Sequence, residues 1–280
     1  MAILILPATV IVVILMGIPL ALMARISFNG FSSTAGMLEQ MFTAQNYWRA
    51  VSDPFYQDVL LTTLGIALLC TIVTLALAFP VAYWLARMES RYKSLFTILT
   101  LFPLLVGNVV RAAGWVALLG SSGLVNASLL GAGLISSPVK LMYTPGAVIA
   151  GIVGVVLPYM VLTLSAVIES IRRETEEAAA NLGASPFTVF RRIVLPQATP
   201  GVVAGCALVF ILCMNAYSTP VLLGGPQFQM MAPAVYDQFT RASNWPFGAA
   251  LSFVLLAVTL LLTVAGSALL GRRYNLRSAK

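Results

Sequence analysis

Long apolar segments, separated by shorter polar ones, make up most of this chain. Six of them reach the roughly 20 residues that a helix needs to cross about 30 Å of hydrocarbon. The pattern predicts an all-α membrane protein with six transmembrane helices, forming a single domain over residues 1–280. We place the spans at residues 3–23, 59–86, 94–119, 145–168, 201–223 and 247–270.

Composition agrees with this interpretation. Hydrophobic residues make up 60% of the chain and charged residues only 9%, and the mean hydropathy is +0.95. A soluble globular domain usually has about 25% charged residues. The chain therefore has too little polar surface for a soluble globule, and we expect it to lie in a lipid bilayer.

The basic residues fall mainly on one side of the predicted bundle. Because Lys and Arg are enriched in cytoplasmic loops, this side is predicted to be cytoplasmic, with both chain ends there. The same rule accounts for the net charge of +7 without a nucleic-acid partner. Eleven of the 16 basic residues belong to this group: Arg87, Arg91, Lys93, Arg172, Arg173, Arg191, Arg192, Arg272, Arg273, Arg277 and Lys280.

The first apolar segment has no basic flank before it, so a cleaved signal peptide is an alternative to a first span. A signal peptide has a basic start, a short apolar core and small residues at its cleavage site. This segment has the length of a span and ends in Ala21-Leu22-Met23-Ala24. We therefore expect a retained first helix.

Much enzyme chemistry is excluded by residues that the sequence lacks. The chain contains no His, and therefore no catalytic triad, imidazole base or His metal ligand. It has no G-x-x-x-x-G-K-[ST] loop for ATP phosphates, so an ATP-driven function needs a separate ATPase subunit. Cys70, Cys206 and Cys213 fall in predicted spans without further ligand residues, and we interpret them as packing thiols. We expect neither an enzyme nor a metal site.

The polar segment 169–200, between the fourth and fifth predicted spans, is dense in charge. Residues 176–182 are good helix formers, with carboxylates in the first turn where they favour the helix dipole. Gly183 follows at the position where a left-handed cap suits glycine. The segment therefore begins with a short helix that ends in a glycine turn.

A second helix is predicted to follow this turn. Ser185-Pro186 is typical of a helix start, because the hydroxyl caps free amides and Pro suits the first helical position. Phe187 and Phe190 lie three residues apart and are expected to share an apolar face. Leu195-Pro196 is expected to end the unit.

Seven positions in this segment form the pattern E-A-A-x3-G-x9-I-x-L-P. The pattern resembles the cytoplasmic coupling loop of importer permeases of the ATP-binding cassette superfamily. The resemblance implies the type I permease fold, with a loop that inserts into a groove on an ATPase subunit; a plain amphipathic connector is the alternative. The coupling residues it implies, together with Phe187, are Glu177, Ala178, Ala179, Gly183, Ile193, Leu195 and Pro196.

The same resemblance implies the partners and the location. A permease of this class pairs with a second permease, two ATPase subunits and an external, periplasmic substrate-binding protein in the bacterial inner membrane. It binds no cofactor itself, because ATP and Mg belong to the ATPase subunits.

Further motifs resemble the permeases of spermidine and putrescine importers, which implies a polyamine cargo. Permeases for iron(III), thiamine, opines and other amino-acid-like compounds, and phosphonates share parts of these motifs and remain alternatives. The matching residues are Asn108, Arg111, Trp115, Asn126, Leu157-Pro158-Tyr159 and Trp245-Pro246-Phe247-Gly248-Ala249-Ala250.

Polar residues inside spans are costly and mark candidate pathways. Pro158 and Pro220 each remove a helix hydrogen bond, and such breaks are tolerated where the backbone faces protein or water. We therefore expect the third, fourth and fifth spans to line the route. For Tyr159, ordinary hydrogen bonding between helices is an equal alternative. The pathway candidates are Asn108, Tyr159, Asn215 and Tyr217.

Arg111 is the one charged residue within the predicted third span. Facing the route, it would repel a polycation, because like charges in a medium of low dielectric constant repel strongly. We expect a structural pair, with an acidic residue of the partner subunit or with Asp237. The alternative is a pathway residue for a cargo with an anionic group.

Two other classes of protein fit the sequence less well. An ion-coupled secondary transporter needs titratable groups near the membrane midplane, and a membrane enzyme needs a nucleophile, base or metal cluster. The predicted spans contain no Asp, Glu, His or Lys. An importer permease therefore accounts best for the sequence.

Overall fold

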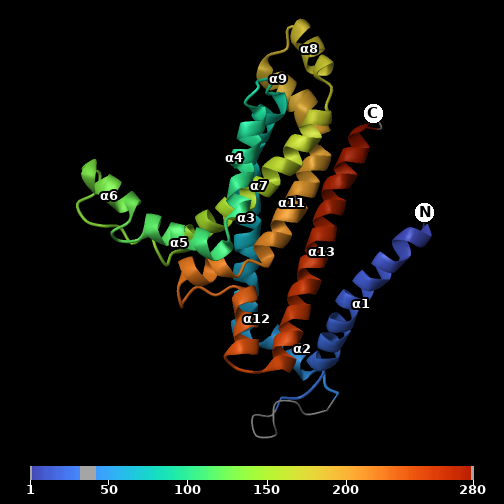
Figure 1. The fold of residues 1–280 in the computed structure, drawn as a ribbon, viewed down its shortest axis with the longest axis vertical. Coiled ribbons are helices and arrows are strands. Elements are labelled where there is room, and N and C mark those ends of the chain that lie inside the picture. Colours follow the sequence, from blue (N-terminus) through green and yellow to red (C-terminus); the bar gives the residue numbers. More distant parts are fainter. Residues whose placement is uncertain (1, 32–41, 279–280) are drawn as a thin grey trace. The chain divides into compact units, whose positions relative to one another are not determined.

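The computed structural model describes residues 2–31 and 42–278, and most of them are helical (Figure 1). Lys280 of the basic tail lies outside these residues. In the described ranges five helices are long and apolar enough to cross a membrane, or six if one bent pair is a single span. This confirms the predicted all-α membrane fold.

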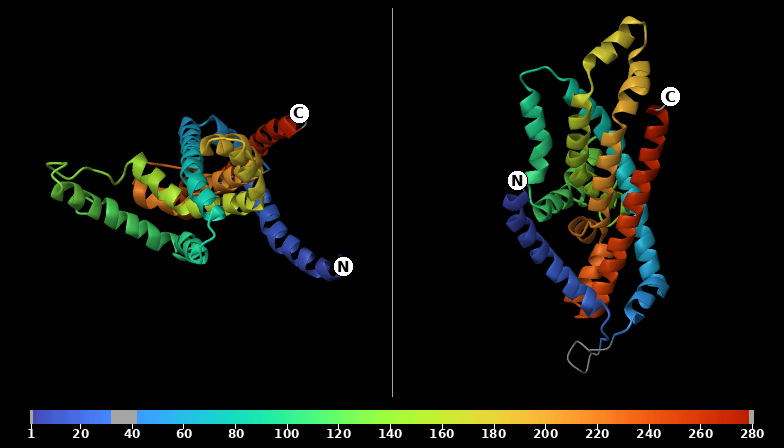
Figure 2. Two further views of the ribbon diagram at one scale, coloured as in Figure 1. Left: turned by 90° about the horizontal axis from the view of Figure 1, so that it is seen from above. Right: turned by 90° about the vertical axis from the view of Figure 1, so that its right-hand side faces the viewer.

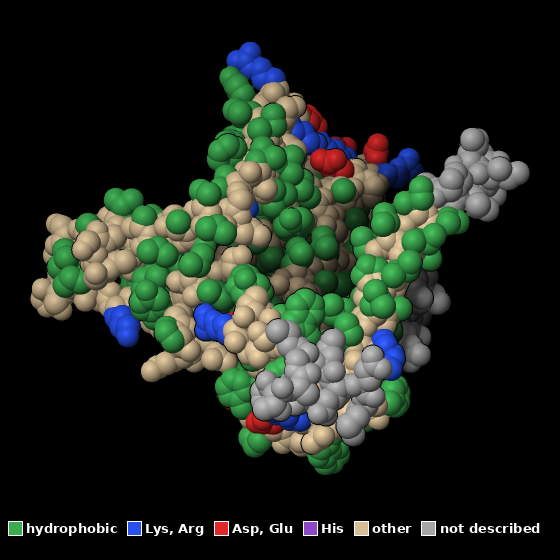
Figure 3. All heavy atoms as spheres, turned by 60° about the horizontal axis from the view of Figure 1, so that its bottom comes forward, with side chains coloured by type: hydrophobic (Ala, Val, Ile, Leu, Met, Phe, Trp, Pro, Cys, Tyr) green, Lys and Arg blue, Asp and Glu red, His purple; other side chains and the backbone are tan. Residues whose placement is uncertain are grey.

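Apolar side chains are spread over the whole described part of the face seen in Figure 3, and charged side chains gather in a few places. Large apolar residues such as Leu61, Val110 and Leu261 are about two-thirds exposed, at 67%, 67% and 68%. Soluble monomers rarely expose this much apolar surface. It matches a chain surrounded by lipid.

The chain divides into two compact units, which we describe separately. The prediction of a single domain over residues 1–280 stays a prediction. The smaller unit covers Met1–Thr62 and Met230–Val258. Its helices are α1 (Ala2–Ser27), α2 (Gln45–Ser52), the first part of α3 (Pro54–Arg87), α12 (Met231–Thr240) and the first part of α13 (Trp245–Ser278).

Phe247 is the centre of packing in the smaller unit and is only 1% exposed. The ring of Tyr56 meets it edge-on at 5.0 Å, and the guanidinium of Arg49 lies 4.7 Å from its centroid. Gln238 Nε2 donates a hydrogen bond of 3.1 Å to the Tyr56 hydroxyl, which ties α12 to α3. The motif that opens the sixth predicted span is therefore a packing motif here.

The larger unit covers Thr63–Gln229 and Thr259–Lys280. Helices α7 and α11 pack along each other at its centre, and glycines allow the close approach. A Cβ added at Gly205 would lie 2.6 Å from Met160 Sδ, and one at Gly201 would lie 2.9 Å from Val167 Cβ. The elements that lie wholly in this unit are α4 (Lys93–Leu105), α5 (Asn108–Leu119), α6 (Leu124–Gly131), α7 (Pro145–Ser170), α8 (Arg173–Asn181), α9 (Pro186–Val189), the π-helical η1 (Phe190–Val194), α10 (Leu195–Gln197), α11 (Thr199–Met214) and the π-helical η2 (Pro220–Gly224).

The prediction of one continuous third span over residues 94–119 was wrong. Helix α4 ends at Leu105 after 13 residues, Val106 is extended with ψ 126°, and α5 begins at Asn108. Pro103, inside α4, cannot donate a backbone hydrogen bond, which weakens the helix just before the break. The span-length apolar segment is instead Asn108–Gly131, which Figure 1 shows leaving the α4–α7 pair at a steep angle.

The predicted fifth span, residues 201–223, is also interrupted. Helix α11 ends at Met214, and the chain runs through a short non-helical stretch before Pro220 starts η2. At its other end, the segments Pro186–Gln197 and Thr199–Met214 meet at a bend of 66°. Because proline removes a donor at each of these places, the interruptions leave fewer unsatisfied backbone groups than other residues would.

Candidate functional site

The predicted coupling loop has the local structure that its sequence indicates. Helix α8 ends at Asn181, and Gly183 follows with φ +84°, in the left-handed region that favours glycine. Ser185 then caps α9, because its Oγ accepts a hydrogen bond of 3.3 Å from the Thr188 amide. Figure 2 shows these segments, in yellow, at one end of α7 and α11. The prediction of helix, glycine turn and second helix is confirmed.

The end of this unit differs from the prediction. Leu195-Pro196 does not end the second helix, because α9 runs into η1 and then into α10. The Leu195 amide donates to the Phe190 carbonyl, a π-helical bond, and Pro196 adds no donor that would need an acceptor. The chain bends after Gln197, where α11 begins at Thr199.

The sequence predicted that Phe187 and Phe190 share one apolar face. In the structure they lie in different environments. Phe190 packs inward, with its ring 5.3 Å from Phe79 and 6.0 Å from Tyr83. Phe187 is 69% exposed. Leu182, just before the glycine turn, is 89% exposed and was missed by the sequence analysis, although an apolar residue in so polar a stretch is a usable signal.

The motif residues divide into an outward and an inward group. Glu177, Ala178, Gly183 and Leu195 are exposed, so this chain leaves them open to a partner. Ala179, Ile193 and Pro196 are half-buried and support the loop from within. Together with Leu182 and Phe187, the outward group forms what we call the docking face.

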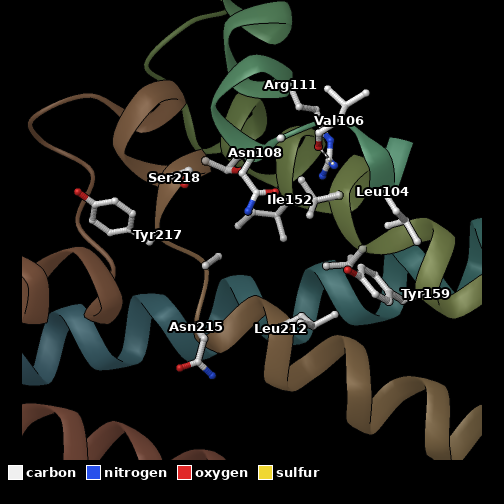
Figure 4. A pocket seen from close by; sticks show the side chains of 15 residues that line it. Leu104, Val106, Asn108, Arg111, Ile152, Tyr159, Leu212, Asn215, Tyr217 and Ser218 are labelled. Atoms are coloured by element: carbon white, nitrogen blue, oxygen red, sulfur yellow. Dashed lines mark hydrogen bonds between the residues drawn. The ribbon is translucent and has the colours of Figure 1, made fainter. Parts of the chain in front are cut away.

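A cavity of about 460 Å³ lies in the larger unit, where α4 breaks, beside α7 and beyond the end of α11 (Figure 4). All four pathway candidates and Arg111 line it, and so does Ser218. Residues of the third, fourth and fifth predicted spans line this cavity, and the expectation that these spans line the translocation route stays a prediction. Its described lining contains no carboxylate. The candidates it brings together are Asn108, Tyr159, Asn215 and Tyr217.

Arg111 holds the broken end of α4. Its Nη2 donates to the carbonyls of Pro103 and Val106, the latter at 2.7 Å, and these groups have no helical partner at the break. Its Nε and Nη1 are buried with no hydrogen-bond partner. Asp237 belongs to the smaller unit, where it forms an ion pair of 3.3 Å with Arg241, and its expected pairing with Arg111 stays a prediction.

Other polar motif residues serve the backbone. Asn126, fully buried, donates from Nδ2 to the carbonyls of Gly120 and Val139 and accepts from the Val139 amide at 2.9 Å. Asn215 Nδ2 donates to the Ile211 carbonyl at 2.9 Å, which caps the end of α11. Asn126 thus fixes the loop after α6, whereas Asn215 both lines the cavity and ends a helix.

Within residues 2–31 and 42–278, no group of three or more His, Cys, Asp or Glu side chains could hold a metal ion. Cys70, Cys206 and Cys213 are free thiols, and Cys70 and Cys213 are buried.

Comparison with known proteins identifies the family. Residues 78–274 match the family described as "Binding-protein-dependent transport system inner membrane component". The spermidine/putrescine transport system permease protein PotB of Escherichia coli is 36% identical over 245 residues, covering 86% of this chain and 89% of that protein. PotB of Salmonella typhimurium is 38% identical over 224 residues, covering 80% of this chain and 78% of that protein.

A crystal structure of a bacterial transporter that imports the acidic polysaccharide alginate has the same fold. It superposes with a TM-score of 0.80 at 16% identity, covering 97% of this chain and 94% of that one. The chain is a non-catalytic, multi-pass inner-membrane permease of an ATP-binding cassette importer. It belongs to the family of binding-protein-dependent transport system inner membrane components.

Proposed function

We propose that the docking face of this permease binds an ATPase subunit and transmits its movements to the membrane spans. The observation that supports this most directly is the exposure of Phe187 and Leu182, at 69% and 89%, on either side of the Gly183 turn. Two large apolar side chains in a polar loop are costly in water and suit a protein groove. Glu177 beside them offers a charge that fixes orientation.

The proposed assembly contains a second permease, two ATPase subunits and a periplasmic binding protein. In this proposal the coupling loop and both termini lie on the cytoplasmic side, which the distribution of basic residues supports through the positive-inside rule. In this arrangement residues 1–280 act as one permease domain, with residues 169–200 as its contact with the ATPase.

We infer that the cavity lined by Asn108, Tyr159, Asn215 and Tyr217 is this subunit's share of the translocation pathway. It holds polar side chains beside two breaks in predicted spans, at Val106 and beyond Met214. Irregular backbone at membrane depth is tolerated where it lines such a space.

The proposed cargo is a polyamine, because the PotB relatives carry that name and cover most of the chain. Tyr159 and Tyr217 offer aromatic faces that attract ammonium groups, and amide oxygens add weak acceptors. The described lining holds no carboxylate, so acidic contacts would come from the binding protein or the second permease. Binding here would be weak and passage fast.

An anionic or zwitterionic solute is the second candidate. The observation that favours it is the pair of unpartnered donors on Arg111, Nε and Nη1, at the cavity wall. Two backbone carbonyls already hold Nη2 of the same guanidinium, which supports the structural role more directly.

Two experiments test the proposal. Affinity purification of the tagged chain should recover its ATPase subunit, and Glu177→Lys should lose it. Glu174→Lys, which changes the same charge three residues earlier on α8, should retain it. Native mass spectrometry of the cognate binding protein should find spermidine or putrescine. A bound anion would overturn the polyamine assignment and leave the docking proposal intact.

A further inference from the structure

Glu176, next to the docking residue Glu177, contacts helix α3. The Tyr83 hydroxyl donates a hydrogen bond of 2.9 Å to Glu176 Oε2, and Arg87 Nη2 forms an ion pair with Oε1. Both carboxylate oxygens are therefore engaged by one helix. The Arg87 and Glu176 side chains are only 15% and 14% exposed.

Arg87 also reaches the chain between α7 and α8. Its Nη1 donates a hydrogen bond of 3.2 Å to the Ile171 carbonyl. From the other side, Arg173 Nη2 donates to the Arg87 carbonyl at 2.6 Å, and Arg173 pairs with Glu89. The end of α3 and the start of α8 are thus connected in both directions.

The second half of the loop packs against the same face of α3. Phe79, Tyr83 and Arg87 are spaced four residues apart, so they lie along one face of the helix. Phe190 meets the first two edge-on, at 5.3 Å and 6.0 Å. Segments before and after the Gly183 turn therefore hold a single helix face.

The covalent route from the loop to α7 is less rigid. Ile171 and Arg172 are both extended, with ψ of 124° and 125°, so α7 and α8 are not one continuous helix. Along the chain, a displacement of α8 reaches α7 through this non-helical joint. It reaches α3 directly, through the shielded Arg87–Glu176 ion pair and through the hydrogen bonds from Tyr83 to Glu176 and from Arg173 to the Arg87 carbonyl.

We propose that Tyr83, Arg87 and Glu176 form a clasp that makes α8 and the end of α3 move as one body during transport. The clasp rests on the proposed docking of the loop to an ATPase. Adjacent residues on a helix point about 100° apart, so Glu177 faces the partner while Glu176 transmits the displacement to the span. Tyr83, Arg87 and Glu176 are positioning residues that do not touch the cargo.

The more exposed ion pairs around the clasp supply matched controls. Lys93 and Glu169 pair at 3.0 Å with 36% and 45% exposure, and Arg172 and Glu174 at 3.9 Å with 85% and 77%. Exposed pairs contribute little, because solvent screens them. Glu174→Gln removes the same charge from the same helix without touching α3.

The test uses the complete complex, with spin labels on cysteines placed at Ser90 and Ala180 in a chain without its native cysteines. Distances between the labels are measured without nucleotide and with the non-hydrolysable analogue AMP-PNP and Mg²⁺. The labelled chain without further substitutions, and the same chain with Glu174→Gln, should each show one narrow label-to-label distance in both nucleotide states. Glu176→Gln should broaden the distribution of distances between the labels. It should also lower the rate of ATP hydrolysis that the binding protein stimulates by about tenfold, the ratio that corresponds to 1.4 kcal/mol.

Rescue separates coupling from simple folding. Arg87→Glu combined with Glu176→Arg should restore the narrow distance, and Tyr83→Phe, which removes only one hydrogen bond, should give an intermediate width. Unchanged distances in both Glu176→Gln and Tyr83→Phe would overturn the clasp. Copurification of the ATPase subunit with the wild-type chain is measured separately. If the ATPase subunit does not copurify, the docking proposal is overturned rather than the clasp.

Discussion

Gly183 allows the coupling loop to be tested by backbone conformation alone. Its φ of +84° lies in the left-handed region, and a Cβ added there would meet no atom within 4 Å. A side chain at this position therefore meets no obstacle within the chain and costs only conformational strain. An L-residue pays about 1–2 kcal/mol for such a conformation, and a β-branched one falls at the upper end.

We expect Gly183→Val to weaken binding of the ATPase subunit by roughly thirtyfold, the ratio that corresponds to about 2 kcal/mol. Gly183→Asn should lose much less, because asparagine tolerates the left-handed region. Ala184→Val adds a similar volume one residue later at a position without positive φ, and serves as the control.

The assay is binding of purified ATPase subunit to the permease pair in nanodiscs, measured for each variant. We expect the affinity to fall in the order wild type, Gly183→Asn, Gly183→Val, with Ala184→Val near wild type. Equal losses in the Val and Asn variants would refute the conformational argument and point to contacts at the turn itself. Wild-type binding in both would refute the assignment of this loop as the docking site.

Three further predictions concern the cavity and the topology. Arg111→Ala removes the donor to two carbonyls at the end of α4 and should lower the free energy of unfolding by about 1.5–3 kcal/mol. The loss is measured as a lower unfolding temperature, and a fully stable variant that no longer transports would place Arg111 in the pathway. Tyr217→Ala or Asn215→Leu should slow spermidine uptake while the complex with the ATPase survives, and unchanged uptake in both would remove them from the pathway. Cysteines at Ser90 and Ser185 should react with an impermeant thiol reagent only after the cytoplasmic face is opened, whereas one at Ser243 should react from outside; exchange of these patterns would reverse the orientation.

Local signals in the sequence were sufficient for the first half of the coupling loop. Gly183 and Ser185-Pro186 act through the conformations that their own backbones allow, so the turn and the second helix start could be predicted without tertiary contacts. The inward turn of Phe190 could not, because it depends on Phe79 and Tyr83, which lie about a hundred residues away in the sequence. The π-helical bonds after Phe190 leave no simple sequence signal either.

The cavity was predictable in its residues but not in its architecture. Polar residues in apolar segments identified Asn108, Tyr159, Asn215 and Tyr217, because such residues are costly in lipid wherever they stand. The break at Val106 was missed, since a hydropathy window averages over about 19 residues and does not register a single extended one. Arg111 stabilises that break through backbone carbonyls, which a search for charged partners does not consider.

Helix α12 shows a similar limit. Its ten residues, Met231–Thr240, are too few to cross a membrane and include Pro233, so hydropathy and helix propensity both fail to mark it. Its place is fixed by contacts within the smaller unit, such as the bond from Gln238 to Tyr56.

ATP-driven import is tested most directly by spermidine uptake into proteoliposomes that contain this chain, its second permease and the ATPase subunits, with the binding protein added outside. ATP enclosed within the vesicles should drive accumulation of spermidine, and Gly183→Val should strongly reduce it in a complex that still inserts. Accumulation driven by an ion gradient without ATP would contradict the account, as would full ATP-driven uptake by the Gly183→Val variant.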